Sequence, residues 1–230
     1  MKKCMTMTHT IITKSICTKF SLLLLLGVSL LSCNQQQEPL PYYGTEEVLL
    51  QDENGEDYID TVYKKITGFN FIDQDSNRIT EKTVAGKIYV VDFFFTSCPT
   101  ICPKMKQQML RIYKEYEENE NVVLLSHSID FRNDTVPKLK RYAEKLEIES
   151  EKWHLVTGTK EGIYGIAKEY ILPAQEDDSA PGGYLHSGQF VLMDGNHHIR
   201  GYYDGTVPTD VDLLMKHMDL LLEEQKNQNQ

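Results

Sequence analysis

The pattern of apolar and polar positions divides the chain into alternating strands and helices. Residues 87–95 (KIYVVDFFF) and 121–129 (NVVLLSHSI) are apolar on both faces, which is typical of strands buried inside a sheet. Between them, from Pro99 to about Glu117, apolar residues recur every three or four positions, which predicts a helix. Two buried strands and the helix that joins them make a predicted βαβ unit.

Patterns on either side complete the predicted order of elements. They indicate a hairpin, a helix that starts near Asp134 or Thr135, a short strand, a helix capped by Thr159, two strands around a tight turn, and a closing helix. These elements occupy residues 69–80, 134–146, 153–158, 160–170, 189–205 and 209–224. We therefore expect an α/β fold, with a thioredoxin-like mixed sheet flanked by helices and an N-terminal β-hairpin extension. This topology is preferred because Cys98 is expected to open the helix after a central strand, where thioredoxins keep their active site.

The N-terminus has the pattern of an export signal. Residues 1–19 contain four lysines and no acidic residue, residues 20–31 are largely apolar, and the run ends in Leu-Leu-Ser-Cys at Cys33. This run is too short to cross a bilayer, which takes about 20 residues. The stretch ending at Cys33 resembles the bacterial lipobox, whose cysteine is lipidated. The alternative is an ordinary signal peptide with an incidental cysteine.

These signals divide the chain into three parts. We expect a lipoprotein signal peptide in residues 1–32, a lipidated tether with an irregular segment in residues 33–60, and a thioredoxin-like domain in residues 61–226. The protein would then be lipid-anchored in the bacterial cell envelope and face the periplasm, with inner or outer membrane left open. Cleavage leaves 20 of 24 basic residues against 34 acidic ones, a formal charge of −14, which excludes nucleic acid as a partner.

Once the signal peptide and Cys33 are set aside, Cys98 and Cys102 are the remaining cysteines. A structural disulfide between them would constrain little chain, which leaves a redox pair or a metal clamp. The start of a helix stabilises a thiolate, so the pKa of Cys98 is expected to fall below its usual value of about 8.5. A thiolate both attacks disulfides and binds soft metal ions, so the pair alone does not choose between these roles.

The spacing of the cysteines favours a metal. Three residues separate them, where thioredoxins have two, and a four-residue step puts both sulfurs on one helix face. Two thiolates favour Cu(I) or Zn(II), and a third ligand is then needed. His186 precedes the strand that begins at Gln189, at the position that faces the active-site turn in thioredoxin-like proteins. Its imidazole would complete a trigonal site suited to copper.

Asp92 keeps a redox role open. It lies six residues before Cys98 inside a buried strand, where thioredoxins have an aspartate that assists proton transfer. Burial would raise the pKa of this carboxyl, which makes Asp92 a candidate proton acceptor. The alternative is a carboxylate bonded to nearby backbone. Met105, Met109 and His127 are interpreted as core residues rather than ligands.

Three segments together resemble the SCO/SenC family of copper-binding, thioredoxin-fold assembly factors for cytochrome c oxidase. They are FFFTSCPTICPKM, HSIDFRNDT and YLHSGQFVLMD, within a similarity that runs from about residue 66 to residue 222. The family pattern is CPxxCP plus one distant histidine, which this chain matches at Cys98, Pro99, Cys102, Pro103 and His186. The resemblance implies copper bound by the two cysteines and the histidine.

The resemblance also implies a metallochaperone, not an enzyme, that prepares the copper A centre of cytochrome c oxidase. Its partner would be the copper-receiving oxidase subunit or another cuproprotein. The alternative is an extracytoplasmic thiol:disulfide oxidoreductase that keeps a partner's copper-site cysteines reduced and draws on a thiol–disulfide reductant. The two roles can coexist, because the dithiol can hold Cu(I) and the disulfide cannot. A thiol peroxidase is disfavoured, because peroxidatic cysteines usually lack a partner one helical turn away.

Overall fold

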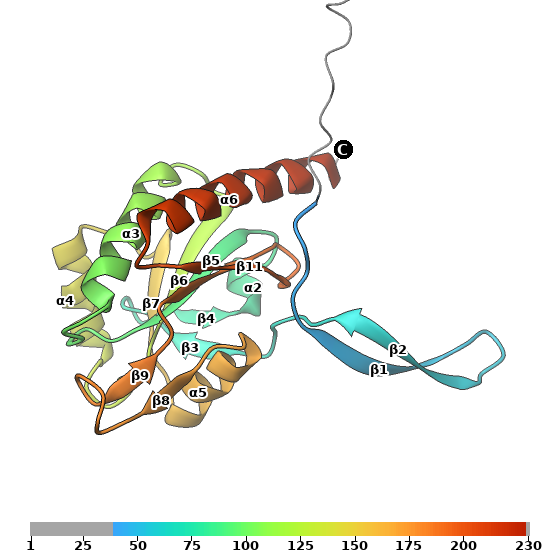
Figure 1. Cartoon of the computed structure of the whole chain (residues 1–230), viewed down its shortest axis with the longest axis horizontal. Coiled ribbons are helices and arrows are strands. Elements are labelled where there is room, and N and C mark those ends of the chain that lie inside the picture. Colours follow the sequence, from blue (N-terminus) through green and yellow to red (C-terminus); the bar gives the residue numbers. More distant parts are fainter. Residues whose placement is uncertain (1–38, 229–230) are drawn as a thin grey trace, which may run out of the picture. The chain divides into compact units, whose positions relative to one another are not determined.

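The computed structural model describes residues 39–228, and its elements follow the predicted order with two additional hairpins and one short helix (Figure 1). The predicted elements are found as β3 (Asn70–Ile72), β4 (Arg78–Thr80), β5 (Ile88–Phe94), α3 (Cys102–Glu115), β6 (Val122–Ser128), α4 (Val136–Leu146), β7 (Trp153–Val156), α5 (Lys160–Glu169), β10 (Gln189–Met193), β11 (Ile199–Asp204) and α6 (Pro208–Gln228). The additional elements are β1 (Thr45–Gln51), β2 (Asp57–Tyr63), α2 (Glu81–Val84), β8 (Ala174–Glu176) and β9 (Tyr184–His186). The predicted signal peptide and Cys33 lie outside the described residues.

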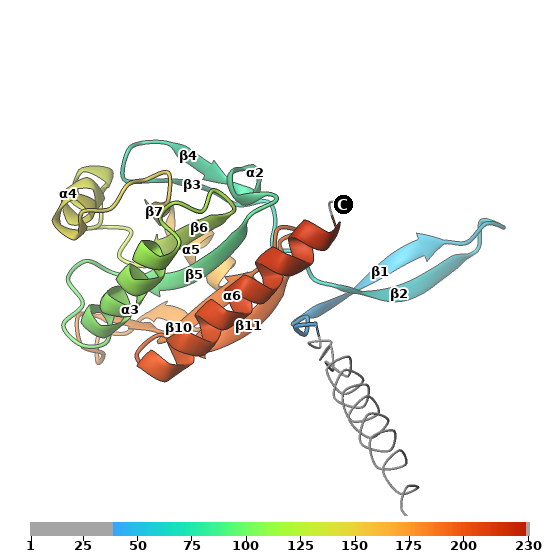
Figure 2. The ribbon, with the colours of Figure 1, turned by 90° about the horizontal axis from the view of Figure 1, so that it is seen from above.

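Five strands form the central sheet in the order β11-β10-β5-β6-β7. Strands β5, β6 and β7 are parallel, whereas β10 is antiparallel to both β5 and β11. Helices α3 and α6 cover one face of the sheet, and α5 lies with the β3–β4 hairpin on the other face (Figures 1 and 2). The fold is therefore thioredoxin-like, as predicted. No helix within residues 39–228 is long and apolar enough to cross a membrane.

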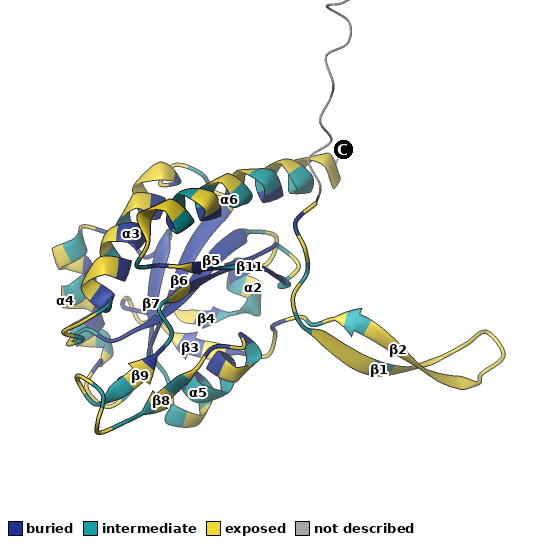
Figure 3. Ribbon diagram, viewed as in Figure 1, coloured by how far each residue is buried: buried dark blue, intermediate teal, exposed yellow. Residues whose placement is uncertain are grey.

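The centre of the sheet is the most deeply buried part of the described chain (Figure 3). All seven residues of β5 and all seven of β6 are buried, which confirms the prediction made from their two-sided apolar pattern. Met105 and Met109 lie on the buried face of α3, also as predicted. His127 lies in the core against the rings of Phe71 and Phe93.

Helix α3 begins one turn later than the sequence suggests. The prediction that Cys98 opens the helix is wrong, because the first helical residue is Cys102 and residues 96–101 form turns. Proline has no backbone N–H to donate, so it is tolerated only in the first turn of a helix. A helix that started at Cys98 would place Pro103 in its interior. Starting at Cys102 places Pro103 in the first turn, where its missing N–H costs nothing.

The irregular segment expected in residues 33–60 is also different where the structure describes it. Strands β1 and β2 pair in antiparallel register from Thr45 with Tyr63 to Gln51 with Asp57, and all their residues are exposed except Val48 and Val62, which are half-buried. The apolar side chains alternate with acidic ones on both faces, so the buried-face pattern that identifies a strand is absent from the sequence. The connecting turn is fixed by Asp52, whose carboxylate accepts the backbone N–H groups of Asn54 and Glu56 at 2.8 Å each.

Candidate metal and redox site

The loop between β5 and α3 presents Cys98 and is held in place by Asp134. This buried carboxylate accepts the backbone N–H of Thr96 at 2.9 Å and its hydroxyl at 2.6 Å. It also accepts the hydroxyl of Ser128, at the end of the neighbouring strand β6, at 2.6 Å. The sequence suggested Asp134 as a possible cap of α4, but Thr135 occupies that position. Asp134 instead ties the cysteine loop to the adjacent strand.

The structure brings Cys98, Cys102 and His186 together at the carboxyl ends of β5 and β9. Their two Sγ atoms and one imidazole nitrogen all lie within 4.8 Å of one another. Cys102 and His186 are buried and Cys98 is half-buried. In a trigonal site with metal–ligand bonds of about 2.0–2.3 Å, neighbouring ligand atoms would be roughly 4 Å apart. The three atoms therefore need only small movements to share one ion.

His186 presents a free lone pair to the two sulfurs. Its Nδ1 lies 2.9 Å from the backbone oxygen of Ser187, which can only accept a hydrogen bond, so the ring proton is on Nδ1. Nε2 is then an acceptor, and it lies 3.2 Å from Sγ of Cys102. Burial lowers the pKa of this imidazole, although the bond to Ser187 opposes the shift. A neutral imidazole with its second nitrogen bonded to a carbonyl is the usual form of a metal-binding histidine.

The two thiols differ in acidity. Burial disfavours the ionised form of Cys98, but its interaction with the Cys102 side chain and hydrogen bonds from the backbone N–H groups of Thr100 and Cys102 outweigh it and lower the pKa of Cys98. Burial raises the pKa of Cys102 well above its usual value, and its interaction with Cys98 raises it further. The lowered pKa of Cys98 agrees with the prediction. Cys98 is thus the first of the pair to ionise and also the more accessible one.

Strand β9 positions His186 through contacts that the sequence analysis did not identify. The hydroxyl of Tyr184 donates to the buried carboxylate of Asp130 at 2.8 Å. The ring of Phe95 contacts both Tyr184, at a centroid distance of 5.3 Å, and His186, at 5.9 Å. A side chain at Gly182 would come within 2.8 Å of Phe95, so this glycine lets the loop before β9 pack closely against the site. In the sequence, the one hint of these contacts is that Tyr184 stands two residues before His186.

Asp92 is fully buried next to the site, as predicted. Burial raises the pKa of its carboxyl to about 7, while a hydrogen bond donated by the hydroxyl of Ser126 opposes the shift. That hydroxyl accepts the indole N–H of Trp153 at 2.8 Å, so its own hydrogen is directed to Asp92. The alternative of a bond to nearby backbone is not what the structure shows. Asp92 and Cys102 line the same small cavity, which has room for about one water molecule.

The sequence model of the SCO1/SenC family matches residues 60–220. Among solved structures, a SCO1/SenC family lipoprotein from Bacillus anthracis is 29% identical, with a TM-score of 0.63, over 69% of this chain and 95% of that one. Arabidopsis thaliana ScoI with copper bound is 27% identical, with a TM-score of 0.57, over 67% and 99% of the two chains.

A third similar structure is BsSco, described as a member of the Sco family of cytochrome c oxidase assembly proteins with a disulfide switch. It is 25% identical, with a TM-score of 0.60, over 67% of this chain and 91% of that one. The similarity to all three structures covers about two thirds of the chain. The family match extends over 161 of 230 residues and includes both cysteines and the histidine. On this evidence the chain belongs to the SCO1/SenC family.

Proposed function

We propose that this protein is a copper-binding metallochaperone that assists maturation of the copper A centre of cytochrome c oxidase. The observation that carries the proposal is the convergence of Cys98, Cys102 and His186, whose ligand atoms lie within 4.8 Å of one another. Two soft sulfur ligands and one imidazole suit copper, and the related Arabidopsis protein has been crystallised with copper bound. The copper-receiving oxidase subunit, or another cuproprotein, is the proposed partner.

A competition titration with a Cu(I) chelator tests this function. The expected result is one tightly bound copper per chain, with affinity lost on Cys98→Ser or Cys102→Ser and strongly reduced on His186→Ala. His217→Ala is the matched control, because His217 lies on α6 and bonds to Tyr203 rather than to the site. Equal affinity in the wild type and in His186→Ala would overturn the assignment of the third ligand.

A second role as an extracytoplasmic thiol:disulfide oxidoreductase is favoured by the unequal thiols. The thiolate of Cys98 would attack a partner's disulfide, and Cys102 would then displace the partner while its proton passes toward Asp92, the proposed acceptor. A reductant of the thiol–disulfide class would restore the dithiol. Equilibration with glutathione buffers should give a reduction potential of about −120 to −270 mV. His186→Ala should retain this exchange, whereas Cys98→Ser should abolish it.

The location of the protein is part of the proposal. Residues 1–32 would be cleaved as a lipoprotein signal peptide, Cys33 would carry the lipid, and a tether would lead to a domain ending near residue 226. The Bacillus anthracis relative is described as a lipoprotein, which supports an extracytoplasmic, lipid-anchored protein of the bacterial envelope. Metabolic labelling with a fatty-acid analogue should mark the wild type and not Cys33→Ser.

A further inference from the structure

Strands β1 and β2 form an arm, residues 45–63, that extends away from the sheet and is exposed along its length (Figures 1 and 3). The arm carries five of the eleven large hydrophobic side chains that are exposed in residues 39–228. They are Leu49, Leu50, Tyr58, Ile59 and Tyr63. An isolated two-stranded hairpin is marginally stable in water, and clustered exposed apolar side chains mark interaction sites. Most of the arm also precedes residue 60, where the family match begins.

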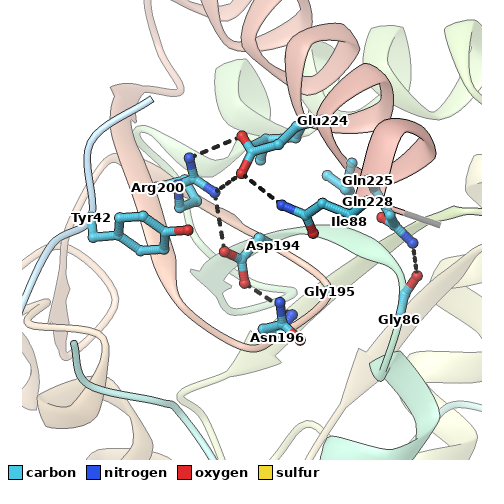
Figure 4. A pocket seen from close by; sticks show the side chains of 11 residues that line it. Tyr42, Gly86, Ile88, Asp194, Gly195, Asn196, Arg200, Glu224, Gln225 and Gln228 are labelled. Carbon is cyan, nitrogen blue, oxygen red and sulfur yellow. Dashed lines mark hydrogen bonds and ion pairs between the residues drawn. The ribbon is translucent and has the colours of Figure 1, made fainter. Parts of the chain in front are cut away.

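The base of the arm is bonded to the domain at several points. Residues 43 and 66, on either side of the arm, donate backbone hydrogen bonds of 2.9 and 3.0 Å to Ile199 and His197, in and beside the β10–β11 turn. The buried guanidinium of Arg200 donates to the backbone oxygens of Leu40 and Pro41. It also lies 4.1 Å from the ring centre of Tyr42 (Figure 4). The Tyr42 ring stacks on Tyr63 at the root of the arm. The base of the arm is therefore anchored to the domain, which lowers the ordering cost of docking.

The charge of the arm identifies the kind of partner. Residues 45–63 contain seven carboxylates and no lysine or arginine. The acidic residues are Glu46, Glu47, Asp52, Glu53, Glu56, Asp57 and Asp60. A second copy of the arm would be repelled, and a lipid surface would have to accept all seven charges. The chain after the predicted cleavage site has no basic residue outside the described region that could cover the arm.

We propose that the β1–β2 arm is a docking element for a protein with a basic face, which receives Leu49 and Ile59 in an apolar recess and pairs its cations with the surrounding carboxylates. Leu49 and Ile59 are cross-strand partners on one face of the hairpin, and each is 68% exposed. The base of the arm lies at the β10–β11 turn, beside the start of β5, whereas the cysteines follow the end of β5. A protein held by the arm therefore leaves the cysteines accessible, and docking does not depend on copper.

Site-specific photo-crosslinking of the full-length chain in its native cells tests the docking role. Benzoylphenylalanine replaces Ile59 in the arm or, as the position control, the exposed Leu213 on α6. The expected result is a discrete protein adduct from position 59 alone, whose partner, identified by mass spectrometry, has a basic docking face. The adduct should form equally in Cys98→Ser, so loss of copper binding and loss of docking are distinguishable.

Neutralising charges tests the electrostatic part. The variant Glu46→Gln/Glu47→Gln/Asp57→Asn/Asp60→Asn keeps Asp52, which builds the turn, and should reduce the adduct about tenfold. The matched control, Glu117→Gln/Glu118→Gln/Glu120→Gln/Glu151→Gln, removes the same charge from a separate acidic cluster and should leave the adduct unchanged. Four outcomes would each overturn the proposal. They are an adduct with a second copy of this chain, an adduct with lipid only, the absence of any adduct, and a protein adduct that persists after the arm carboxylates are neutralised.

Discussion

Asp92 is an ionisable residue in an environment that disfavours its charged form. A carboxylate sits in the middle of a fully buried strand, with the hydroxyl of Ser126 as its hydrogen-bond donor. Burial raises its pKa to about 7, so near neutral pH it can hold or release a proton. Its position beside Cys102 gives this proton a use in the proposed thiol exchange, which offers a reason to keep an acid in the core.

The raised pKa of Asp92 predicts a pH-dependent cost to stability. The folded protein keeps this proton to a higher pH than the unfolded chain, so the Asp92 contribution lowers the free energy of unfolding as pH rises from about 4 to about 7. Asp92→Asn should remove that dependence, and its gain over the wild type should grow by about 2–3 kcal/mol between pH 5 and pH 8. Urea denaturation of the reduced, metal-free proteins measures this difference. Asp178→Asn, in the loop before β9, is the control and should show no such growth.

At the scale of elements, the β8–β9 hairpin decides where the histidine lies. His186 is the last residue of β9 and pairs with Ala174 of β8, so its backbone is fixed by a sheet of only two short strands. Such a small sheet is weak by itself. The bond from Tyr184 to Asp130 ties it to the end of β6, and Phe95 packs against it from the cysteine loop. Preorganisation of His186, the proposed third ligand, therefore depends on contacts outside the hairpin.

Tyr184→Phe tests this dependence, because it keeps the ring against Phe95 and removes only the hydrogen bond to Asp130. A hydrogen bond to a charged group contributes about 1.5–3 kcal/mol, and part of that loss should appear as copper affinity weakened about threefold to tenfold. Tyr164→Phe is the matched control, because the Tyr164 hydroxyl is buried without a hydrogen-bond partner in the described structure. Chelator competition should separate the two variants. Equal copper affinity in both would show that Tyr184 does not position His186.

The sequence predicted well those elements whose burial produces a local pattern of apolar residues. β5 and β6 are apolar on both faces, and the two cysteines follow β5 directly, so fold class and cysteine loop could be predicted together. The position of His186 beside Cys102, 84 residues away along the chain, could be predicted from topology. Asp130 and Tyr184 are 54 residues apart, and no periodicity selects one carboxylate among 34 acidic residues as the partner. The arm was missed because it buries neither face, and hydrophobic patterns report burial rather than pairing.

At the scale of the whole described molecule, Arg200 joins three parts that are distant in sequence (Figure 4). Its side chain is 1% exposed, and its guanidinium donates to the backbone oxygens of residues 40 and 41, to Asp194 in the β10–β11 turn at 3.2 Å, and to Glu224 on α6 at 3.1 Å. All its donors face acceptors, which is the condition for burying a cation without a large penalty. The same residue thus closes the domain and holds the chain that leads into the arm.

Arg200→Met should therefore be far more damaging than loss of a surface ion pair. It leaves the backbone oxygens of residues 40 and 41 without their donor and removes the buried cation that pairs with Asp194, which costs about 3–5 kcal/mol in free energy of unfolding. Arg111→Met is the matched control, because Arg111 pairs with Asp212 where both side chains are more than 40% exposed, and its loss should cost less than about 1 kcal/mol. Denaturant unfolding measures both variants, and amide exchange at residues 42–44 should accelerate only in Arg200→Met. If the two variants lose similar stability, Arg200 is not the residue that joins residues 40 and 41 to α6. The base of the arm is then held by the backbone bonds to the β10–β11 turn alone.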